Sequence, residues 1–533
     1  MKRSDSRSRS YKALIFLTGA VTLSLELLAS RIMTPYFGVS LYIWSGILSI
    51  TLIFLALGYQ IGGRISRNSE HRTLEFFFLM APPISAVSIT ISCAVYPVIF
   101  SSLSQIDLVL GSYLGALLLL AVPLVALSAM NPFLITLTRG AEATGDAGAG
   151  RVLFISTIGS VVGVLVTTFV FIPNMTNYRA LLWLGVGLCV GAAVVTIGST
   201  QLSITMRRRV IGGCALAAIP GLGLLTWQDE YLDLVASSST AAYEFRIRGE
   251  YTSVFGNVKA VELQPRQQGL LPMLAYIQDG LIQNRVSLDG RSLSPYTYVL
   301  EYLSDMFVAE KRDALVLGLG AGFVPRNMKK RGLNVSVVEI NSDALKAATE
   351  FFGFDPAGIE IHLEDARTFV RRCDSQYDVI FVDAFQGDNI PDYLLTSEFF
   401  ADLESCIRPG GAVVMNAIFD DIDEEPNRHL LATVASAFRL VYEFRMPNAN
   451  AFIVAKQSSD DARSDIDLDR VPDPLWGIVA RTLSSGRLVT RQMLIGARPV
   501  TDARNTISVL FAPANMRDRQ LLVDLIPTNI LLN

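Results

Sequence analysis

The chain has 533 residues, of which 51% are hydrophobic and only 18% are charged, a composition too apolar for one water-soluble protein of this length. Its net charge of −4 argues against a nucleic-acid partner, because such proteins carry a strongly positive surface. The chain has only three histidines, and its five cysteines form no CxxC or Cys/His pattern. The sequence therefore predicts no metal site.

The apolar residues are concentrated at the start of the chain. About 20 apolar residues cross a bilayer, so seven long apolar runs predict a membrane domain at 1–228, with the lipid bilayer as a partner. The runs are 11–33, 41–63, 76–100, 113–138, 152–172, 179–199 and 210–227. In the second of them, the glycines of GYQIGGR at 58–64 predict close helix packing.

Basic residues indicate the orientation of the membrane domain. Lys2 and Arg3 precede the first run, and the even-numbered loops carry further arginines, such as Arg207–Arg209. The positive-inside rule then predicts a cytoplasmic N-terminus in the cytoplasmic membrane. Seven crossings place the rest of the chain outside, where Cys373 and Cys406 could form a disulfide. If 210–227 does not cross, the rest of the chain stays on the cytoplasmic side, so the side that it faces stays open.

The remaining residues have the composition of a globular protein. Residues 229–300 alternate short apolar and polar stretches, which predict a small β subdomain. Residues 301–456 alternate apolar runs with helices, which predicts a Rossmann-like parallel sheet of βαβ units. The runs LVYEFRM and AFIVAK would close that sheet as an antiparallel hairpin. Residues 457–533 are assigned as a linker and C-terminal segment.

The first strand–helix turn lies in ALVLGLGAGFVPR, residues 314–326, where Gly318, Gly320 and Gly322 alternate with other residues. Glycines at such a turn let the backbone approach a ligand at the start of a helix. The spacing GxGxG favours an adenosyl group over the pyrophosphate of a dinucleotide. Ala321 places an uncharged methyl group at the tip of this turn.

Carboxylates follow the next three strands. Glu339 in VVEIN is placed to accept hydrogen bonds from ribose hydroxyls, or is simply a solvated acid. Asp365 and the Ala366 backbone are placed to bind adenine, and Asp365 can also cap a helix. Asp383 in IFVDAF faces the crevice outside the strand ends, where burial would raise its pKa and make it a proton acceptor. The loop after it, AFQGDNIPDYLLT, predicts either a substrate lid or a plain connection.

In this order the glycine turn, VEIN, EDAR, VDAF and IRPGG (407–411) resemble the motifs of the spermidine/spermine synthase family. The stretch IQDGLIQ (277–283) resembles its LDGxxQ motif, and the N-terminal part resembles the membrane-fused branch of that family. The resemblance implies a class I SAM-methyltransferase-like domain with a small N-terminal β subdomain. It also implies aminopropyl transfer from decarboxylated S-adenosylmethionine to a polyamine or related amine. No cofactor would be bound permanently, because the S-adenosyl compound would be a co-substrate. Whether the protein forms a homodimer is left open.

Carried over by motif, the resemblance assigns the predicted site residues. Asp383 is the catalytic proton acceptor, and Gly318, Gly320, Gly322, Glu339, Asp365 and Ala366 bind the nucleoside. Gln283, Tyr296 and Gln386 face the substrate. The amine side departs from the family, because Ala321 and Gln386 stand where its aspartates bind ammonium groups, and Thr297-Tyr298 replaces its glutamate motif.

These departures leave the acceptor open and keep two alternatives. The first is a SAM-dependent methyltransferase or SAM-cleaving enzyme, for which Ala321 would leave room for a methionine carboxylate. The second is a transporter or scaffold with a non-catalytic nucleotide-binding domain. Glu26 and Arg31, charged residues in the first apolar run, motivate this second alternative.

Overall fold

The computed structural model describes residues 2–38, 41–138, 147–199, 202–235, 242–373, 377–385, 387, 389–420, 422–447, 450–458, 463, 467–523 and 526–532. The chain divides into two compact units. The membrane unit comprises Met1–Ser239 with Val523–Asn533, and the second unit is Thr240–Leu522. Each unit is described by itself.

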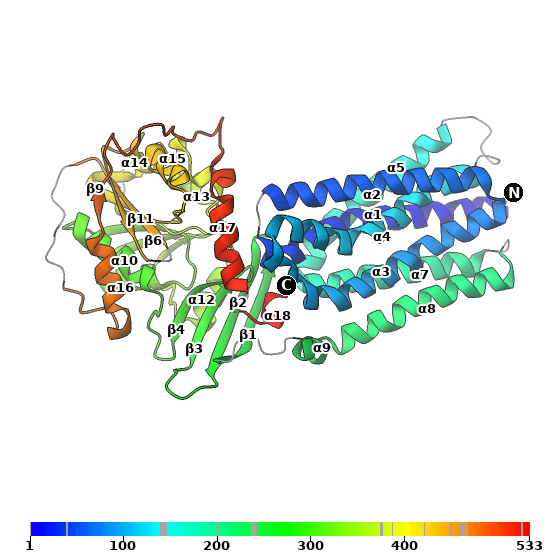
Figure 1. The fold of residues 1–533 in the computed structure, drawn as a ribbon, viewed down its shortest axis with the longest axis horizontal. Helices are drawn as coiled ribbons and strands as arrows, with labels where there is room; N and C mark the ends of the chain where they lie inside the picture. Colours follow the sequence, from blue (N-terminus) through cyan, green and yellow to red (C-terminus); the bar gives the residue numbers. More distant parts are fainter. Residues whose placement is uncertain are drawn as a thin grey trace. The chain divides into compact units, whose positions relative to one another are not determined.

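The membrane unit is a bundle of helices (Figure 1). Its elements are α1 (Lys2–Phe37), α2 (Leu41–Asn68), α3 (His71–Ile106), α4 (Leu108–Thr138), α5 (Ala147–Val166), the π-helical turn η1 (Thr167–Phe171), α6 (Ile172–Asn174), α7 (Asn177–Gly198), α8 (Ile204–Thr226), α9 (Gln228–Val235) and α18 (Thr528–Leu531). In the described residues, seven helical stretches are long and apolar enough to cross a membrane. Each predicted apolar run falls on one of them.

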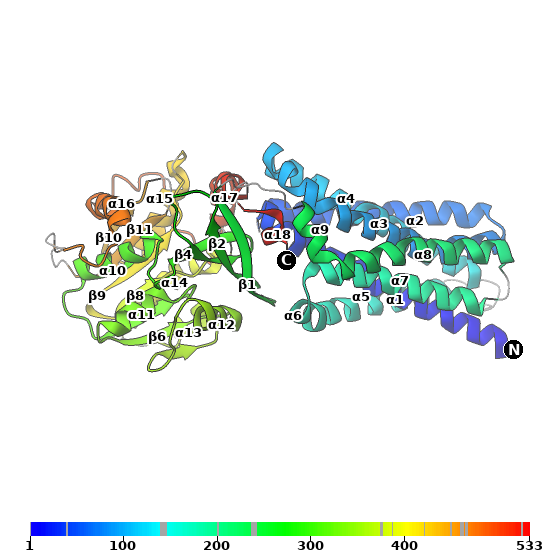
Figure 2. The same cartoon turned by 90° about the horizontal axis from the view of Figure 1, so that it is seen from below.

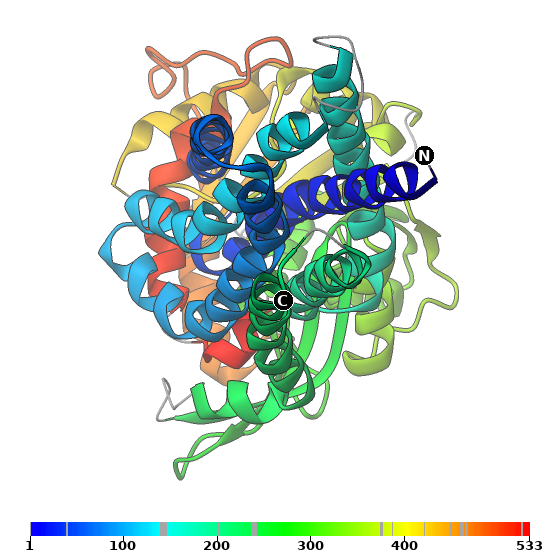
Figure 3. The ribbon, with the colours of Figure 1, turned by 90° about the vertical axis from the view of Figure 1, so that its right-hand side faces the viewer.

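Small residues let these helices approach closely. A Cβ on Gly58 of α2 would overlap Ser128 of α4, and one on Gly62 would lie 2.7 Å from the Ala129 carbonyl oxygen. The predicted close packing at GYQIGGR is therefore present between α2 and α4. Gly159 and Gly163 likewise allow α5 to pack closely against α1, because a Cβ on either would overlap a carbonyl of α1. Figure 3 views these helices roughly along their axes.

The second unit begins with a four-stranded antiparallel sheet in the order β1-β2-β3-β4. Its strands are β1 (Tyr243–Ser253), β2 (Gly256–Pro265), β3 (Met273–Gln278) and β4 (Leu281–Ser287). The turn between β3 and β4 uses Asp279 and Gly280, which both have positive φ. Asp279 is a buried aspartate whose Oδ1 accepts the Asn257 N–H at 2.9 Å, so it ties this turn to β2.

An eight-stranded sheet follows in the order β12-β10-β11-β9-β8-β5-β6-β7. Strands β5 to β9 are parallel, and the hairpin β10–β11 pairs antiparallel with β9. The strands are β5 (Asp313–Leu317), β6 (Asn334–Val338), β7 (Glu360–His362), β8 (Tyr377–Val382), β9 (Ile407–Ala417), β10 (Leu440–Arg445), β11 (Ala451–Lys456) and β12 (Arg487–Leu488). This is the predicted doubly covered α/β sheet with its closing hairpin.

Helices cover both faces of this sheet (Figures 1 and 2). They are α10 (Pro295–Phe307), α11 (Phe323–Lys330), α12 (Ser342–Phe351), α13 (Ala366–Val370), η2 (Asp392–Leu394), α14 (Ser397–Cys406), α15 (Glu424–Ala435), α16 (Asp473–Ser484) and α17 (Ile507–Val523). Side chains alternate along each strand. Leu315 and Leu317 accordingly pack in the core with α14 and α15, and Ala314 and Val316 in the core with α10 and α16.

Three features bear on the predicted domain boundaries. Helix α10 runs across residue 300, where the β subdomain was expected to end. Strand β12 and helix α16 belong to the sheet unit, although residues 457–533 were assigned as linker and C-terminal segment. Within the membrane unit, α18 packs against α9 and α3.

Cys373 and Cys406 are joined as a disulfide with their Cα atoms 5.2 Å apart.

Candidate active site

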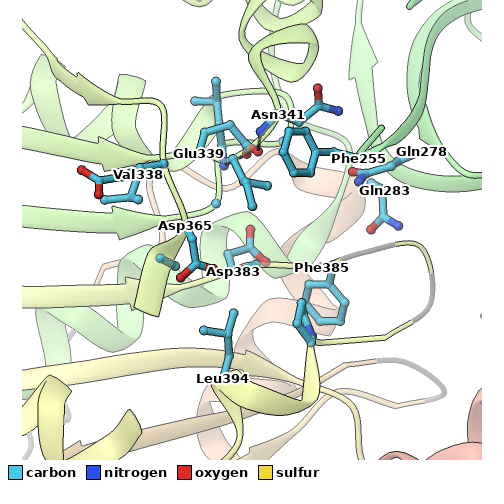
Figure 4. Close-up of a pocket in the computed structure, with 18 of the residues that line it drawn as sticks. Phe255, Gln278, Gln283, Val338, Glu339, Asn341, Asp365, Asp383, Phe385 and Leu394 are labelled. Atoms are coloured by element: carbon cyan, nitrogen blue, oxygen red, sulfur yellow. Dashed lines mark hydrogen bonds between the residues drawn. The ribbon is translucent and has the colours of Figure 1, made fainter. Parts of the chain in front are cut away.

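A cavity of about 280 Å³ lies outside the carboxyl ends of β5, β6 and β8, where open α/β sheets bind their ligands. Strands β3 and β4 and the loop after β8 complete its walls. In Figure 4, Asp383 lies near the middle, with Asp365 on one side and Gln278 and Gln283 on the other. Within the described ranges, no group of three or more His, Cys, Asp and Glu side chains could hold a metal ion.

The three glycines of the turn have different functions. Gly318 and Gly320 line the cavity, and nothing lies within 4 Å of a Cβ built on Gly320, so a ligand can approach that backbone. Gly322 was predicted to bind the nucleoside, but it precedes α11 and is not on the cavity wall. With φ +77, its missing Cβ would lie 2.6 Å from the Phe354 ring. Gly322 therefore serves helix packing instead.

Ala321 also lies away from the cavity. Its side chain is 3% exposed and packs in an apolar cluster with Val258, Tyr276 and Phe352. The predicted space for a methionine carboxylate at Ala321 is therefore occupied by the packing of the β subdomain against the turn.

Glu339 is held in place by the backbone of the turn. Its Oε2 accepts the Leu319 N–H at 2.9 Å, and its Oε1 accepts the Asn341 N–H at 2.7 Å. Burial raises its pKa, and these backbone bonds oppose the shift. A carboxylate has about four acceptor positions, and Glu339 lines the cavity, so it can accept a further hydrogen bond from a ligand there.

Asp365 and Ala366 line the same cavity. Asp365 Oδ1 accepts the Thr368 N–H at 2.8 Å, which is the helix cap predicted as its alternative function. Its Oδ2 accepts the Tyr393 hydroxyl at 2.9 Å. An adenine amino group approaching Asp365 would therefore share that oxygen with Tyr393. The loop after β8 supplies Pro391, Tyr393 and Leu394 to this wall.

Asp383 follows β8 and is enclosed by the protein. Burial raises its pKa to about 6, and the Asn416 side chain opposes the shift. Asn416 Nδ2 donates to Asp383 Oδ1 at 2.8 Å, and Asn450 Nδ2 donates to Asn416 Oδ1 at 2.7 Å. A carboxylate with such a pKa is ionised near neutral pH and still basic enough to accept a proton.

At the opposite end of the cavity, the polar side chains among the described residues are uncharged. Gln283 and Tyr296 line it, and Gln283 Nε2 donates to the Gly387 carbonyl at 2.6 Å. The buried Tyr296 hydroxyl lies near enough to Asp383 for that carboxylate to raise its pKa, burial being the larger cause. Gln386, the third predicted substrate residue, lies outside the described residues.

Sequence reasoning missed several residues of the site. Asn416 lies near the end of β9, and Asn450 immediately precedes β11. The available signal was an asparagine near the end of the strand that follows Asp383 in the chain. Tyr276 is fully buried and lines the cavity, and its hydroxyl has no hydrogen-bond partner among the described residues. Asn341 Nδ2, on the same wall, is likewise unpaired there. Such buried groups fit a ligand that carries polar atoms.

Comparison with known proteins agrees with this geometry. Residues 294–449 match the family model described as "Spermine/spermidine synthase domain". This part of the chain is a spermine/spermidine synthase domain. It holds β5 to β10, and with them the glycine turn, Glu339, Asp365 and Asp383.

Curated relatives match the same region. A "Probable polyamine aminopropyl transferase" of Bifidobacterium longum is 31% identical over 156 residues, 29% of this chain and 35% of the relative. A "Polyamine aminopropyltransferase" of Vibrio vulnificus is 30% identical over 159 residues, 28% of this chain and 52% of the relative. The chain thus spans between about a third and a half of the length of these curated relatives.

Among solved structures, a probable spermidine synthase from Corynebacterium glutamicum superimposes with a TM-score of 0.40 and 19% sequence identity. The superposition covers 48% of this chain and 97% of that one.

Proposed function

We propose that the synthase domain transfers an aminopropyl group from an S-adenosyl-type donor, decarboxylated S-adenosylmethionine, to a small-molecule amine. The observation that carries this proposal is Asp383, a partly buried carboxylate that lines the cavity and whose pKa is raised to about 6. The names of the curated relatives support the same reaction class.

The chemistry requires one proton transfer at the reacting nitrogen. The neutral amine attacks the propyl carbon next to the sulfonium; a C–N bond forms and the C–S bond breaks. The electron pair of the broken bond stays on sulfur, which leaves as the thioether 5′-methylthioadenosine. Asp383 takes the proton that the nitrogen must lose, and general base catalysis of this kind typically contributes about 10²–10⁴-fold.

The other site residues would orient the two substrates. Glu339 would accept both ribose hydroxyls, and Asp365 with the Ala366 backbone would bind adenine beside the open turn at Gly318 and Gly320. Gln283 and Tyr296 would face the amine. Two oriented substrates also lower the entropic cost of a bimolecular step.

Membrane anchoring belongs to the same proposal. Seven helical stretches compatible with a multi-pass membrane protein precede the synthase domain. We assign residues 1–228 to the membrane domain, 229–300 to the β subdomain and 301–456 to the catalytic domain. The basic residues before the first span support a cytoplasmic N-terminus in the cytoplasmic membrane.

The test uses the full chain in lipid nanodiscs. Wild type should release 5′-methylthioadenosine from decarboxylated S-adenosylmethionine when an amine is present, and Asp383→Asn should lower kcat by about 10²-fold or more. Asp378→Asn is the matched control, because Asp378 lies on the same strand and bonds Arg312 and Arg408. Equal activity of Asp383→Asn and wild type would refute the role of Asp383. Formation of S-adenosylhomocysteine from S-adenosylmethionine instead would support the methyltransferase alternative.

A further inference from the structure

The wall beside Asp365 depends on residues beyond the matched synthase domain. Residues 498–507, which we call the buttress, lie some 50 residues past the end of the match at 449. They contact the segment Pro391–Leu394, and Pro391, Tyr393 and Leu394 of that segment line the cavity.

Asp502 holds this wall through one arginine. Arg367 Nη1 and Nη2 donate to the two oxygens of Asp502 at 2.7 and 2.6 Å. Arg367 Nη1 also donates to the Tyr393 carbonyl at 2.9 Å. The Arg367 side chain is 8% exposed, whereas the Asp502 side chain is 39% exposed, so the guanidinium is shielded and the carboxylate reaches it from the solvent side. A two-pronged arginine–carboxylate pair of this kind fixes orientation as well as distance.

Backbone contacts and apolar packing extend the support. Asn505 Nδ2 donates to the Asp392 carbonyl at 2.8 Å, and the Ser397 N–H donates to the Val500 carbonyl at 2.8 Å. Val500 and Ile507 pack in the same buried cluster as Leu394. The buttress therefore bonds the wall segment directly at Asp392 and, through Arg367, at Tyr393, and it shares a buried cluster with Leu394.

The supported segment acts directly on a predicted nucleoside residue. The Tyr393 hydroxyl donates to Asp365 Oδ2 at 2.9 Å. A shift of Tyr393 would therefore move a hydrogen-bond donor away from the carboxylate and open this end of the cavity. Loops that bind ligands need such support to keep one geometry.

We propose that Asp502 and Asn505 are positioning residues that hold Pro391–Leu394 in the geometry needed to bind the adenine end of the donor. The ligand named here rests on the proposed function. Neither residue lines the cavity, so both act through Arg367 and the wall backbone. Their loss should weaken nucleoside binding and leave the transfer step almost unchanged.

The experiment compares Asp502→Asn, Asn505→Ala and a matched control. Glu424→Gln removes a carboxylate that binds Arg445 in the same two-pronged way, at 2.6 and 2.8 Å, away from the cavity. Hydrogen exchange of the amides at 392–395 is measured first, on full-length protein in nanodiscs without ligand. Exchange should accelerate about tenfold or more in both buttress variants and stay at the wild-type rate in Glu424→Gln.

The second measurement is the affinity for 5′-methylthioadenosine, with kinetics at saturating donor. Both buttress variants should weaken the affinity about tenfold and change kcat less than about threefold. Asp502→Glu should recover part of the lost affinity. Unchanged exchange, or faster exchange with unchanged affinity, would overturn the proposal. A wild type that binds no nucleoside would instead overturn the proposed function, and the exchange measurement would still decide whether the buttress holds the wall.

Discussion

Asn416→Ala should move the pH dependence of catalysis upward. Burial raises the pKa of Asp383 to about 6, and the Asn416 amide opposes the shift through a 2.8 Å hydrogen bond to Oδ1. A hydrogen bond to a charged group contributes about 1.5–3 kcal/mol, and one pKa unit corresponds to about 1.4 kcal/mol. Removing the amide should therefore raise the pKa by ~1–2 units. The base works only when deprotonated, so the midpoint of kcat/KM should move from about pH 6 to ~7–8.

The assay is release of 5′-methylthioadenosine between pH 5 and 9, at low donor concentration. Asn416→Ala should be slower than wild type at pH 6.5 and approach it at pH 9. Asn427→Ala is the control, because Asn427 is equally buried but bonds Asp420 instead. The same midpoint in Asn416→Ala and wild type would refute the argument that this amide tunes Asp383.

The raised pKa of Asp383 also has a consequence for stability. A carboxyl group whose folded pKa lies above its unfolded value of 3.8 destabilises the fold once it ionises. Its favourable contribution is complete below pH 3.8 and is lost as the pH rises through about 6. Two pKa units correspond to about 3 kcal/mol, so Asp383→Asn should raise Tm at pH 8 and not at pH 3.5. Calorimetric melting of the full chain at both pH values measures this, and equal changes at both would contradict it.

The remaining predictions concern the turn, the acceptor and the disulfide. Gly322→Ala should cost about 2 kcal/mol or more in stability, because its Cβ would lie 2.6 Å from a buried ring. Gly320→Ala has open space around its Cβ and should cost about 1 kcal/mol. Chemical denaturation measures the free energy of unfolding of both variants. The kcat/KM for n-butylamine should exceed that for putrescine about tenfold or more, because the second ammonium of putrescine would be buried unpaired. Gln283→Glu should reverse this preference. A wild-type preference for putrescine would contradict the prediction. Cys373 and Cys406 should resist alkylation until a reductant is added, if seven spans carry the domain out of the cytoplasm; reduced thiols in untreated cells would place it inside.

The meeting of three carboxylates in one cavity could be predicted because its determinants are local. Glu339, Asp365 and Asp383 each follow an apolar run, and parallel strands bring their carboxyl ends to one edge. The remaining determinants depend on contacts distant in sequence. Asn416 reaches Asp383 only because β9 pairs with β8, and Asp502 meets Arg367 across 135 positions. The helix cap at Asp365 was predicted, but its bond to Tyr393 required the path of the loop.

Gly322, predicted to bind the nucleoside, lies off the cavity wall for a physical reason. A glycine-rich turn contains residues that admit a ligand and residues that admit a neighbouring side chain, and the two look alike in sequence. The structure separates them, because Gly320 faces open space and Gly322 faces Phe354. The sequence likewise places Ala321 at the tip of the turn but does not show in which direction its methyl group points.

Charge in the cavity is distributed unevenly between its two ends. Among the described residues that line it, the carboxylates are Glu339, Glu364, Asp365 and Asp383, whereas Gln278 and Gln283 line the end opposite Asp365. Under the proposed function, Asp383 would compensate one cation there. Among the described residues at that end, a second buried cation would meet amide or carbonyl oxygens, which are weaker partners than a carboxylate.

Ala321 fits this distribution. An aspartate at that position would place a charge in the apolar cluster of Val258, Tyr276 and Phe352, at a cost of several kcal/mol unless it found a partner. The packing of the β subdomain therefore favours a small apolar side chain at the tip of the turn. Under the proposed function, the donor's tail would then be recognised by the wall that this packing positions, where the Tyr276 hydroxyl has no hydrogen-bond partner among the described residues.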